Sequence, residues 1–420
     1  MVTKIPVIID TDPGVDDVIA ILLALTSPEF EILAFIISYG NTDRGSSYDN
    51  IFKVHQAISR HIIQHPEHKD RFHSLNNTSK PILVAGAEFP LQGDLHSAQY
   101  FHGRDGLGDI STRHPELNLA HNFREEASTH FHVSEEPGAD VILNILRERA
   151  PRAVTYIALG PLTNLLLAMK SDPEVIRGRM GKVVCMGGAL DVPGNTSPVA
   201  EFNFFADPFA VRELLLDPTS AVKLPLERFF LLPLDITTPH ELPFPVYRDR
   251  IDPSFQSTAV PSTELGKQPL VHFTSSFLER TREIMLQFGK DAMELHDVVA
   301  VWFAMENPPF SDDLALGWKT RTRVFEIERT GELTRGMLVV DRRDDASAYA
   351  PGANRAFVQE ELRKLDNTEQ YWESTALPAQ VEVEDPLHTN SCATGVTCVW
   401  DTPGPDKLLR ILLARIWGVE

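Results

Sequence analysis

Short apolar runs alternate with amphipathic stretches along most of the chain, and this alternation predicts strands and helices in turn. Apolar runs of strand length lie at residues 7–9, 32–37, 82–84, 154–158, 183–186, 229–234 and 396–400. Helical periodicity marks residues 16–25, 139–149, 162–169, 207–216 and 407–416. Near-continuous apolar strands separated by helices are typical of parallel sheets that are buried on both faces. The pattern therefore predicts an α/β protein with a single open, mostly parallel sheet and helices on both faces.

Three polar segments without clear periodicity interrupt this alternation. They span residues 66–80, 111–137 and 343–391. Long aperiodic stretches inside a regular fold are typical of surface insertions. The pattern of strands and helices resumes after the last segment, and no linker or internal repeat is visible. We therefore expect one domain, residues 1–420, with probable insertions at these three places.

Composition narrows the possible partners. The chain has 420 residues, 43% hydrophobic and 23% charged, with a net charge of -20. Nucleic acids and anionic lipid surfaces are bound by clustered lysine and arginine, so this charge argues against both. No stretch approaches the roughly 20 apolar residues of a membrane span. We expect a neutral or cationic small molecule as the partner.

Cysteine usage and the first residues bear on the cellular compartment. The only cysteines, Cys185, Cys392 and Cys398, show no CxxC spacing. They therefore indicate neither a disulfide framework nor a cysteine zinc site. The N-terminal apolar run is too short for a secretory segment. We expect a reduced, cytoplasmic location.

The strongest chemical feature is an acidic cluster directly after the first strand. Asp10, Asp12, Asp16 and Asp17 place four carboxylates within eight residues. We expect Asp12 to cap the following helix and Pro13 to occupy its first position. Capping uses one or two acids, and additional like charges at short range repel each other unless a cation neutralises them. The cluster therefore predicts a divalent cation site, and its oxygen ligands favour calcium or magnesium.

Residues 10–17 resemble the N-terminal signature of the inosine-uridine nucleoside hydrolase family, and the general likeness is to its fungal branch. Further family matches follow in the family's order at residues 40–41, 159–164, 186–189, 194–195, 201–203 and 296–297. The resemblance covers nearly the whole chain apart from the three polar segments. It implies the nucleoside hydrolase fold and a homodimer or homotetramer with a role in nucleoside salvage.

The resemblance also implies a site and a reaction. It implies that a calcium ion is held by Asp12, Asp17, Asp297 and the backbone carbonyl of Leu159. The residues expected to face the ribose are Asp16, Asn41, Asn195, Glu201, Phe202 and Asn203. The implied reaction is hydrolysis of the N-glycosidic bond of a ribonucleoside to ribose and free base, by direct attack of a metal-bound water. Asp12 would be the general base and His296 the general acid.

Other interpretations of these residues stay open. His102, in a glycine-rich segment at residues 102–109, is either a second acid or substrate contact, or a structural histidine. The residues Phe273, Phe277, Gln287 and Phe288 either line a base pocket or pack a helix, and we favour packing. Uridine, inosine or both are possible substrates, and the likeness to the fungal branch favours uridine without deciding the preferred nucleobase.

Two alternative functions share parts of the pattern. Asp10-Thr11-Asp12 after a buried strand is also similar to the nucleophile motif of haloacid-dehalogenase-like phosphohydrolases, although Gly14 stands where that motif has Thr or Val. A non-catalytic module that binds ribose and calcium would use most of the same residues. Retention of both Asp12 and His296 favours the enzyme.

Overall fold

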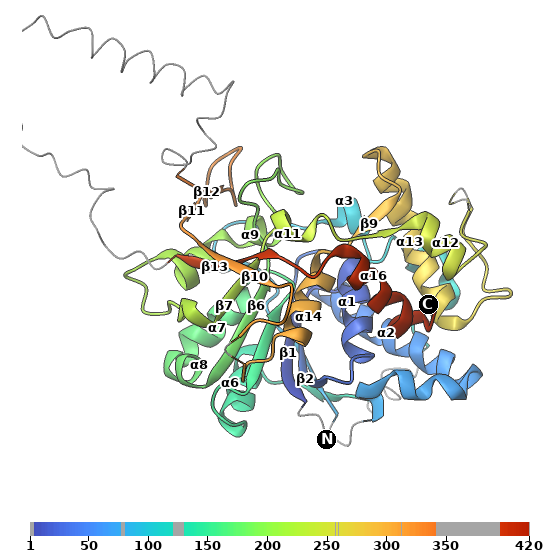
Figure 1. The fold of residues 1–420 in the computed structure, drawn as a ribbon, viewed down its shortest axis with the longest axis horizontal. Helices are drawn as coiled ribbons and strands as arrows, with labels where there is room; N and C mark the ends of the chain where they lie inside the picture. Colours follow the sequence, from blue (N-terminus) through green and yellow to red (C-terminus); the bar gives the residue numbers. More distant parts are fainter. Residues whose placement is uncertain are drawn as a thin grey trace, which may run out of the picture.

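One open sheet of nine strands forms the centre of the molecule (Figure 1). The computed structural model describes residues 4–76, 80–120, 130–256, 258, 260–311, 313–341 and 395–419. The strand order is β10-β13-β7-β6-β5-β1-β2-β3-β4. The strands are β1 (Ile5–Thr11), β2 (Phe30–Ile37), β3 (Ile82–Ala85), β4 (His132–Ser134), β5 (Val154–Ala158), β6 (Met180–Met186), β7 (Phe229–Leu232), β10 (Lys319–Arg323) and β13 (Val396–Asp401).

Neighbouring strands of this sheet pair in parallel, except that β10 and β13 pair antiparallel. Parallel neighbours require crossover connections, and these connections are helices here. The predicted fold class, an open and mostly parallel sheet, is confirmed.

Helices cover both faces of the sheet because successive strand residues point to opposite sides. Val7 and Ile9 of β1 belong to one buried apolar cluster, whereas Ile8 belongs to another. Helices of the first cluster are α1 (Val15–Leu25), α2 (Arg44–Gln64), α12 (Phe244–Arg250), α13 (Pro269–Gln287), α14 (His296–Glu306) and α16 (Pro405–Leu412). Helices of the second are α6 (Gly138–Glu148), α7 (Thr163–Ser171), α8 (Pro173–Arg179) and α10 (Pro208–Val211). Figure 1 shows α1 and α2 on one side of the strands and α6, α7 and α8 on the other.

Short elements complete the described part of the chain. The short helices are α3 (Gln99–His102), α4 (Ile110–Arg113), α9 (Phe202–Ala206) and α11 (Leu234–Thr237). Two small antiparallel ladders join β8 (Glu241–Pro243) to β9 (Ala292–Glu294) and β11 (Glu326–Ile327) to β12 (Leu338–Val339). Wide π-turns at Arg212–Leu216 and Leu413–Trp417 continue α10 and α16.

Two expected boundaries were wrong. The strand expected at residues 229–234 ends at Leu232, because Pro233 follows and precedes the first turn of α11. The first helix begins at Val15 with Gly14 as its N-cap, so Asp12 is not the cap and Pro13 is not helical. The Asp12 carboxylate instead accepts the backbone N–H of Asn41 at 2.7 Å, which removes it from the helix end.

The polar segments have more structure than their sequence suggested. Residues 66–80 contain two 3₁₀ helices, Pro66–Arg71 and His73–Asn76, with Phe72 fully buried between them. The segment at 111–137 contains the edge strand β4, whose three residues pair with β3. The third segment, residues 343–391, lies outside the described residues. That these segments are insertions in a single domain stays a prediction.

The carboxyl ends of the central strands lie at one edge of the sheet. In parallel α/β sheets this edge is where ligands bind. Asp10 and Thr11 end β1, and the loops after β2, β5 and β6 begin there with Ser38, Leu159 and Gly187. Within the residues that the structure describes, no helix is long and apolar enough to cross a membrane.

Candidate active site

A cavity of about 320 Å³ opens at this edge of the sheet. Ten of the twelve site residues predicted from the sequence line it: Asp16, Asn41, His102, Leu159, Asn195, Glu201, Phe202, Asn203, His296 and Asp297. The other two, Asp12 and Asp17, are fully buried. The structure therefore brings together residues from loops and helices that are far apart in the sequence.

Three carboxylates meet at the bottom of the cavity. Asp16, Asp17 and Asp297 each offer an oxygen within 4.8 Å of the other two. Asp17 is fixed by Thr11 Oγ1 at 2.5 Å and by Asn41 Nδ2 at 2.7 Å. Burial, together with the neighbouring carboxylates, raises the pKa of Asp297 well above its usual range. A cluster of this kind favours either protons or a cation between its oxygens.

Asp12 lies beside this cluster with half of its carboxylate unpaired. Its Oδ2 accepts the backbone N–H of Asn41, but its buried Oδ1 has no hydrogen-bond partner among the described residues. Burial first, and then the charge of Asp17, raises the pKa of Asp12. Buried polar atoms are normally paired, so an orphan carboxylate oxygen calls for a ligand. Asp12 Oδ1 is therefore the atom of the site at which we expect a ligand.

Glycines make the space around Asp12. A Cβ on Gly160 would lie 2.5 Å from Asp12 Oδ1, and a Cβ on Gly40 would overlap Oδ2. Gly160 directly follows Leu159, so the absence of a side chain brings the Leu159 peptide close to the carboxylate. The Leu159 carbonyl in turn accepts Asn203 Nδ2 at 2.6 Å.

These donors fit the calcium ion that the sequence implied. Carboxylate and carbonyl oxygens are the ligands of hard cations, and calcium tolerates an irregular set of them. Asp12, Asp17, Asp297 and the Leu159 carbonyl supply only oxygen, and the unpaired Asp12 Oδ1 requires a positive partner.

Asp10 has a different role from its neighbours. Tyr156 Oη donates to its carboxylate at 2.6 Å, and Asn164 Nδ2 donates at 2.7 Å. Burial raises the pKa of Asp10 to about 7, against the effect of both hydrogen bonds. Neutral donors satisfy both of its oxygens, so Asp10 is a structural carboxylate rather than one left for a ligand.

His296 is held by hydrogen bonds at both ring nitrogens. Its Nδ1 lies 2.8 Å from Thr237 Oγ1, and its Nε2 lies 3.1 Å from Glu294 Oε2. Burial opposes the charged imidazolium, but the hydrogen bond and charge of Glu294, together with Asp16 and Glu201, raise the pKa of His296. The site therefore favours a protonated His296 that faces the cavity.

Glu294 is a site residue that the sequence analysis missed. Burial opposes its ionised form, but its bonds to His296 and Lys290 lower the pKa of Glu294 to about 2. Lys290 Nζ donates to Glu294 at 2.5 Å and to Glu241 at 2.9 Å. A signal was present, because residues two apart on an extended chain share a side and Glu294 is two residues before His296.

His102 contacts the first residue of α1 and lines the cavity. Its Nδ1 accepts the backbone N–H of Val15 at 3.1 Å, so the ring proton belongs on Nε2. Burial and the charge of His296 lower the pKa of His102 to about 3. His102 is thus neutral and caps α1 while it lines the cavity, which favours a hydrogen-bond donor over an acid. A catalytic role for it stays a prediction.

The expected ribose contacts are held by backbone bonds. Glu201 caps α9, since it accepts the N–H groups of Asn203 and Gly188, each at 2.7 Å, and of Phe204 at 3.1 Å. Asn195 Oδ1 accepts the N–H of Phe202 at 3.0 Å. These bonds fix the orientation of the polar groups before any ligand arrives. Whether they contact ribose stays a prediction.

The other residues that line the cavity are mostly apolar or aromatic. They are Ala98, Tyr100, Phe101, Met186, Gly194, Met285, Phe288, Lys290, Met293 and Glu294. Phe273 and Phe277 instead pack edge to face in the core, 5.5 Å apart, so the helix-packing interpretation is confirmed for them. The packing interpretation was wrong for Phe288, which is 71% exposed and lines the cavity. The reason is that α13 ends at Gln287, so Phe288 lies beyond the helix.

Comparison with known proteins gives consistent matches. The family described as inosine-uridine preferring nucleoside hydrolase matches residues 7–373. An uncharacterized protein of Schizosaccharomyces pombe is 31% identical over 335 residues, covering 80% of this chain and 88% of that protein. The pyrimidine-specific ribonucleoside hydrolase RihA of Klebsiella pneumoniae is 29% identical over 340 residues, with the same 80% and 88% coverage. A solved plant nucleoside hydrolase superposes with a TM-score of 0.64 at 19% identity, covering 99% of both chains.

Proposed function

Because this chain belongs to the inosine-uridine preferring nucleoside hydrolase family, we propose that it hydrolyses ribonucleosides in a calcium-dependent reaction that releases ribose and free base. The match to the family model confirms the family predicted from the sequence. It also confirms the predicted enzyme class, a ribonucleoside hydrolase that acts on the N-glycosidic bond. The phosphohydrolase alternative has no support in these matches. The observation that carries the calcium dependence is the unpaired, buried Oδ1 of Asp12 beside three clustered carboxylates.

We assign the calcium ligands to Asp12, Asp17, Asp297 and the Leu159 carbonyl. When bound, calcium would position a water molecule and make it more acidic, so that a nearby carboxylate could remove its proton. Asn41 orients two of these ligands, because its backbone N–H binds Asp12 and its amide binds Asp17. Asn203 does the same for the Leu159 carbonyl.

The chain's own acids and bases would then act on the two sides of the bond. Asp12, besides serving as a calcium ligand, would accept the proton of the attacking water as general base, because its Oδ1 has no hydrogen-bond partner among the described residues. Asp16 and Glu201 add negative charge where the sugar becomes positive in an oxocarbenium-like state. His296, kept protonated by Glu294, would donate its Nε2 proton to the departing base when that base takes the place of Glu294 at this nitrogen.

Sugar recognition rests on the fixed polar groups. A ribose hydroxyl both donates and accepts hydrogen bonds, and carboxylates and amides can satisfy both. We place Asp16, Asn195, Glu201 and Asn203 around these hydroxyls, with Phe202 as an apolar wall. Asn41 reaches the sugar less directly, because its amide is already bonded to Asp17.

Uridine is the first substrate we propose, because the Klebsiella relative is described as pyrimidine-specific. A role in nucleoside salvage, a cytoplasmic location and a homodimer or homotetramer are further proposals that rest on the family resemblance. The apolar residues that line the cavity do not distinguish a pyrimidine from a purine.

The test is chromatographic detection of free base from uridine, cytidine, inosine and adenosine, with calcium and with a chelator. We expect calcium-dependent release, and we expect Asp12→Asn to lower turnover by at least about 10²-fold. Asp172→Asn is the matched control, because it makes the same change at the N-cap of α8, a residue that does not line the cavity. No release from any nucleoside by a calcium-binding chain would support the non-catalytic ribose-binding module instead.

A further inference from the structure

A second group of metal-binding side chains lies outside the cavity. His114 follows α4, Glu116 belongs to the 3₁₀ helix Pro115–Leu117, and His272 belongs to α13. One ligand atom from each lies within 4.8 Å of the other two. Both imidazoles are buried, whereas the Glu116 side chain is 41% exposed. The group therefore combines fixed nitrogen ligands with access from solvent.

The distances within this group suit a small tetrahedral ion. Glu116 Oε1 lies 3.3 Å from His114 Nδ1 and 2.9 Å from His272 Nε2. Zinc bonds of about 2.0–2.1 Å in a tetrahedron place neighbouring ligand atoms about 3.3 Å apart. Only small side-chain shifts would open the centre to a metal.

The hydrogen bonds of His114 leave a place for a cation. Its Nε2 lies 3.1 Å from Glu279 Oε2, so both ring nitrogens face carboxylates. A neutral imidazole carries one proton, and if Nε2 donates to Glu279, then Nδ1 and Glu116 Oε1 are two acceptors facing each other. Either a second proton or a metal ion must lie between them. Carboxylate, histidine and metal in this order form a common zinc arrangement that fixes the tautomer.

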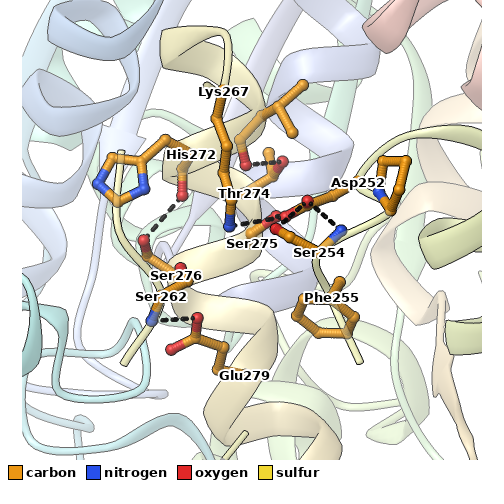
Figure 2. A network of polar contacts seen from close by, with 12 residues as sticks. Asp252, Ser254, Phe255, Ser262, Lys267, His272, Thr274, Ser275, Ser276 and Glu279 are labelled. Atoms are coloured by element: carbon orange, nitrogen blue, oxygen red, sulfur yellow. Dashed lines mark hydrogen bonds and ion pairs between the residues drawn. The ribbon is translucent and has the colours of Figure 1, made fainter. Parts of the chain in front are cut away.

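Neighbouring charges are already paired elsewhere. Lys267 Nζ binds Asp252 at 2.8 Å, and Arg113 binds Glu279 at 3.2 Å. Figure 2 shows Lys267 directed toward Asp252, with the His272 ring on the other side of the network, and Glu279 bonded to the backbone of Ser262. Among the described residues, the ion pairs of the Glu116 carboxylate are those with His114 and His272.

We propose that His114 Nδ1, His272 Nε2 and Glu116 Oε1 form a second metal site that takes zinc, with water as the fourth ligand. Two imidazole nitrogens favour zinc over calcium, which prefers oxygen ligands only. The site would tie the segment after α3 to α13. The neighbouring helix α3 lines the cavity through Tyr100 and His102, and α13 lines it through Met285. Zinc at this place stabilises the mouth of the cavity without entering it.

A second histidine group provides a control. His65, Glu67 and His68 also place ligand atoms within 4.8 Å of one another, but all three are partly or largely exposed. Arg71 lies 2.9 Å from the adjacent His61 Nε2 and puts a fixed positive charge beside this group. We therefore expect the weaker zinc binding here.

The experiment uses the full chain, freed of metal by a chelator and then saturated with calcium to fill the oxygen site. Zinc is titrated, and both bound zinc and the midpoint of thermal unfolding are measured. We expect wild type and His65→Gln to bind one zinc with a rise in the midpoint. Glu116→Gln and His272→Gln should each lose at least about tenfold in zinc affinity. Cobalt in place of zinc should give the visible absorption of a tetrahedral site in the first two proteins only.

Equal zinc affinity in all four proteins would overturn the proposal, as would no binding by wild type, which would leave His114 held by protons alone. Loss of binding in His65→Gln would overturn it too, because the zinc would then belong to the exposed group. If His272→Gln does not fold, Glu116→Gln decides, since its side chain is partly exposed. None of these measurements uses nucleoside hydrolysis, so failure of the proposed function would leave them interpretable.

Discussion

The substitution Gly160→Ala tests the role of Asp12 without removing any proposed ligand. The new methyl group would lie 2.5 Å from Asp12 Oδ1 and 3.3 Å from Ser38 Oγ. The backbone of Gly160 does not have a positive φ, so alanine is not strained there for conformational reasons. The effect of the change therefore comes mainly from the contact with the Asp12 carboxylate, with a weaker contribution from the contact with Ser38.

The size of the effect follows from that contact. Ordinary van der Waals contact begins at 3.4 Å, so Asp12 Oδ1 or the Leu159 peptide must move by about 0.9 Å. Asp12 Oδ2 is held at 2.7 Å by the Asn41 N–H, which limits the carboxylate's retreat. A misplacement of about 1 Å in a reacting group costs about 10²-fold in rate. This corresponds to about 2.7 kcal/mol of transition-state stabilisation.

The assay is kcat/KM for uridine as a function of calcium concentration. We expect about a 10²-fold loss at saturating calcium and a weaker apparent calcium affinity. Gly178→Ala is the matched control, because it adds the same methyl group on α8 with no atom within 4 Å. If Gly160→Ala keeps wild-type kcat/KM and calcium dependence, Asp12 Oδ1 does not act where we place it.

Three further predictions concern protons in the site. His296→Ala should lower the turnover of uridine by about 10²–10⁴-fold. The loss should be smaller on a riboside whose leaving group needs no proton. Equal losses on both substrates would contradict a general acid. Glu294→Gln removes the main partner that raises the pKa of His296, so the alkaline limb of the pH profile of kcat/KM should move to lower pH. If this limb does not move, Glu294 does not raise the pKa of His296. Without metal, the folded-state pKa of Asp16, raised by burial to about 7, exceeds the unfolded value, so folding favours the protonated acid. The unfolding midpoint of the chelated protein should therefore fall as pH rises from about 4 to about 7, and calcium, whose charge favours the ionised acid, should reduce that fall.

The fold was predictable because its central strands are apolar on both faces. Residues 154–158, for example, are buried at every position, and apart from Thr155 the strand consists of apolar or aromatic residues. The edge of the sheet was less predictable. β4 has three residues, two of them exposed, so nothing in its sequence separates it from the surrounding polar segment. Its pairing with β3 supplies the strand, and pairing is not visible in a local pattern.

The site was predictable where its residues follow strands directly. Asp16, Asn41 and Leu159 come from such positions, and they line one cavity. The apolar lining residues were not predictable. Met285 and Phe288 lie at the end of α13, and the sequence does not show whether an apolar residue at a helix end faces a cavity or the core. The helix cap was assigned to Asp12 for a related reason. The competing partner, the N–H of Asn41, is 29 residues away along the chain.

The first strand shows how one motif separates structural from reactive acids. Asp10 and Asp12 are two residues apart and equally buried, so their sequence gives them the same environment. The fold gives Asp10 two neutral donors, Tyr156 and Asn164, whereas Asp12 receives a single N–H and keeps one oxygen unpaired. An unpaired buried carboxylate destabilises the metal-free fold, and for the same reason it binds a cation or a proton strongly. The instability and the reactivity of this site thus have one cause, the number of donors that the fold supplies to each aspartate.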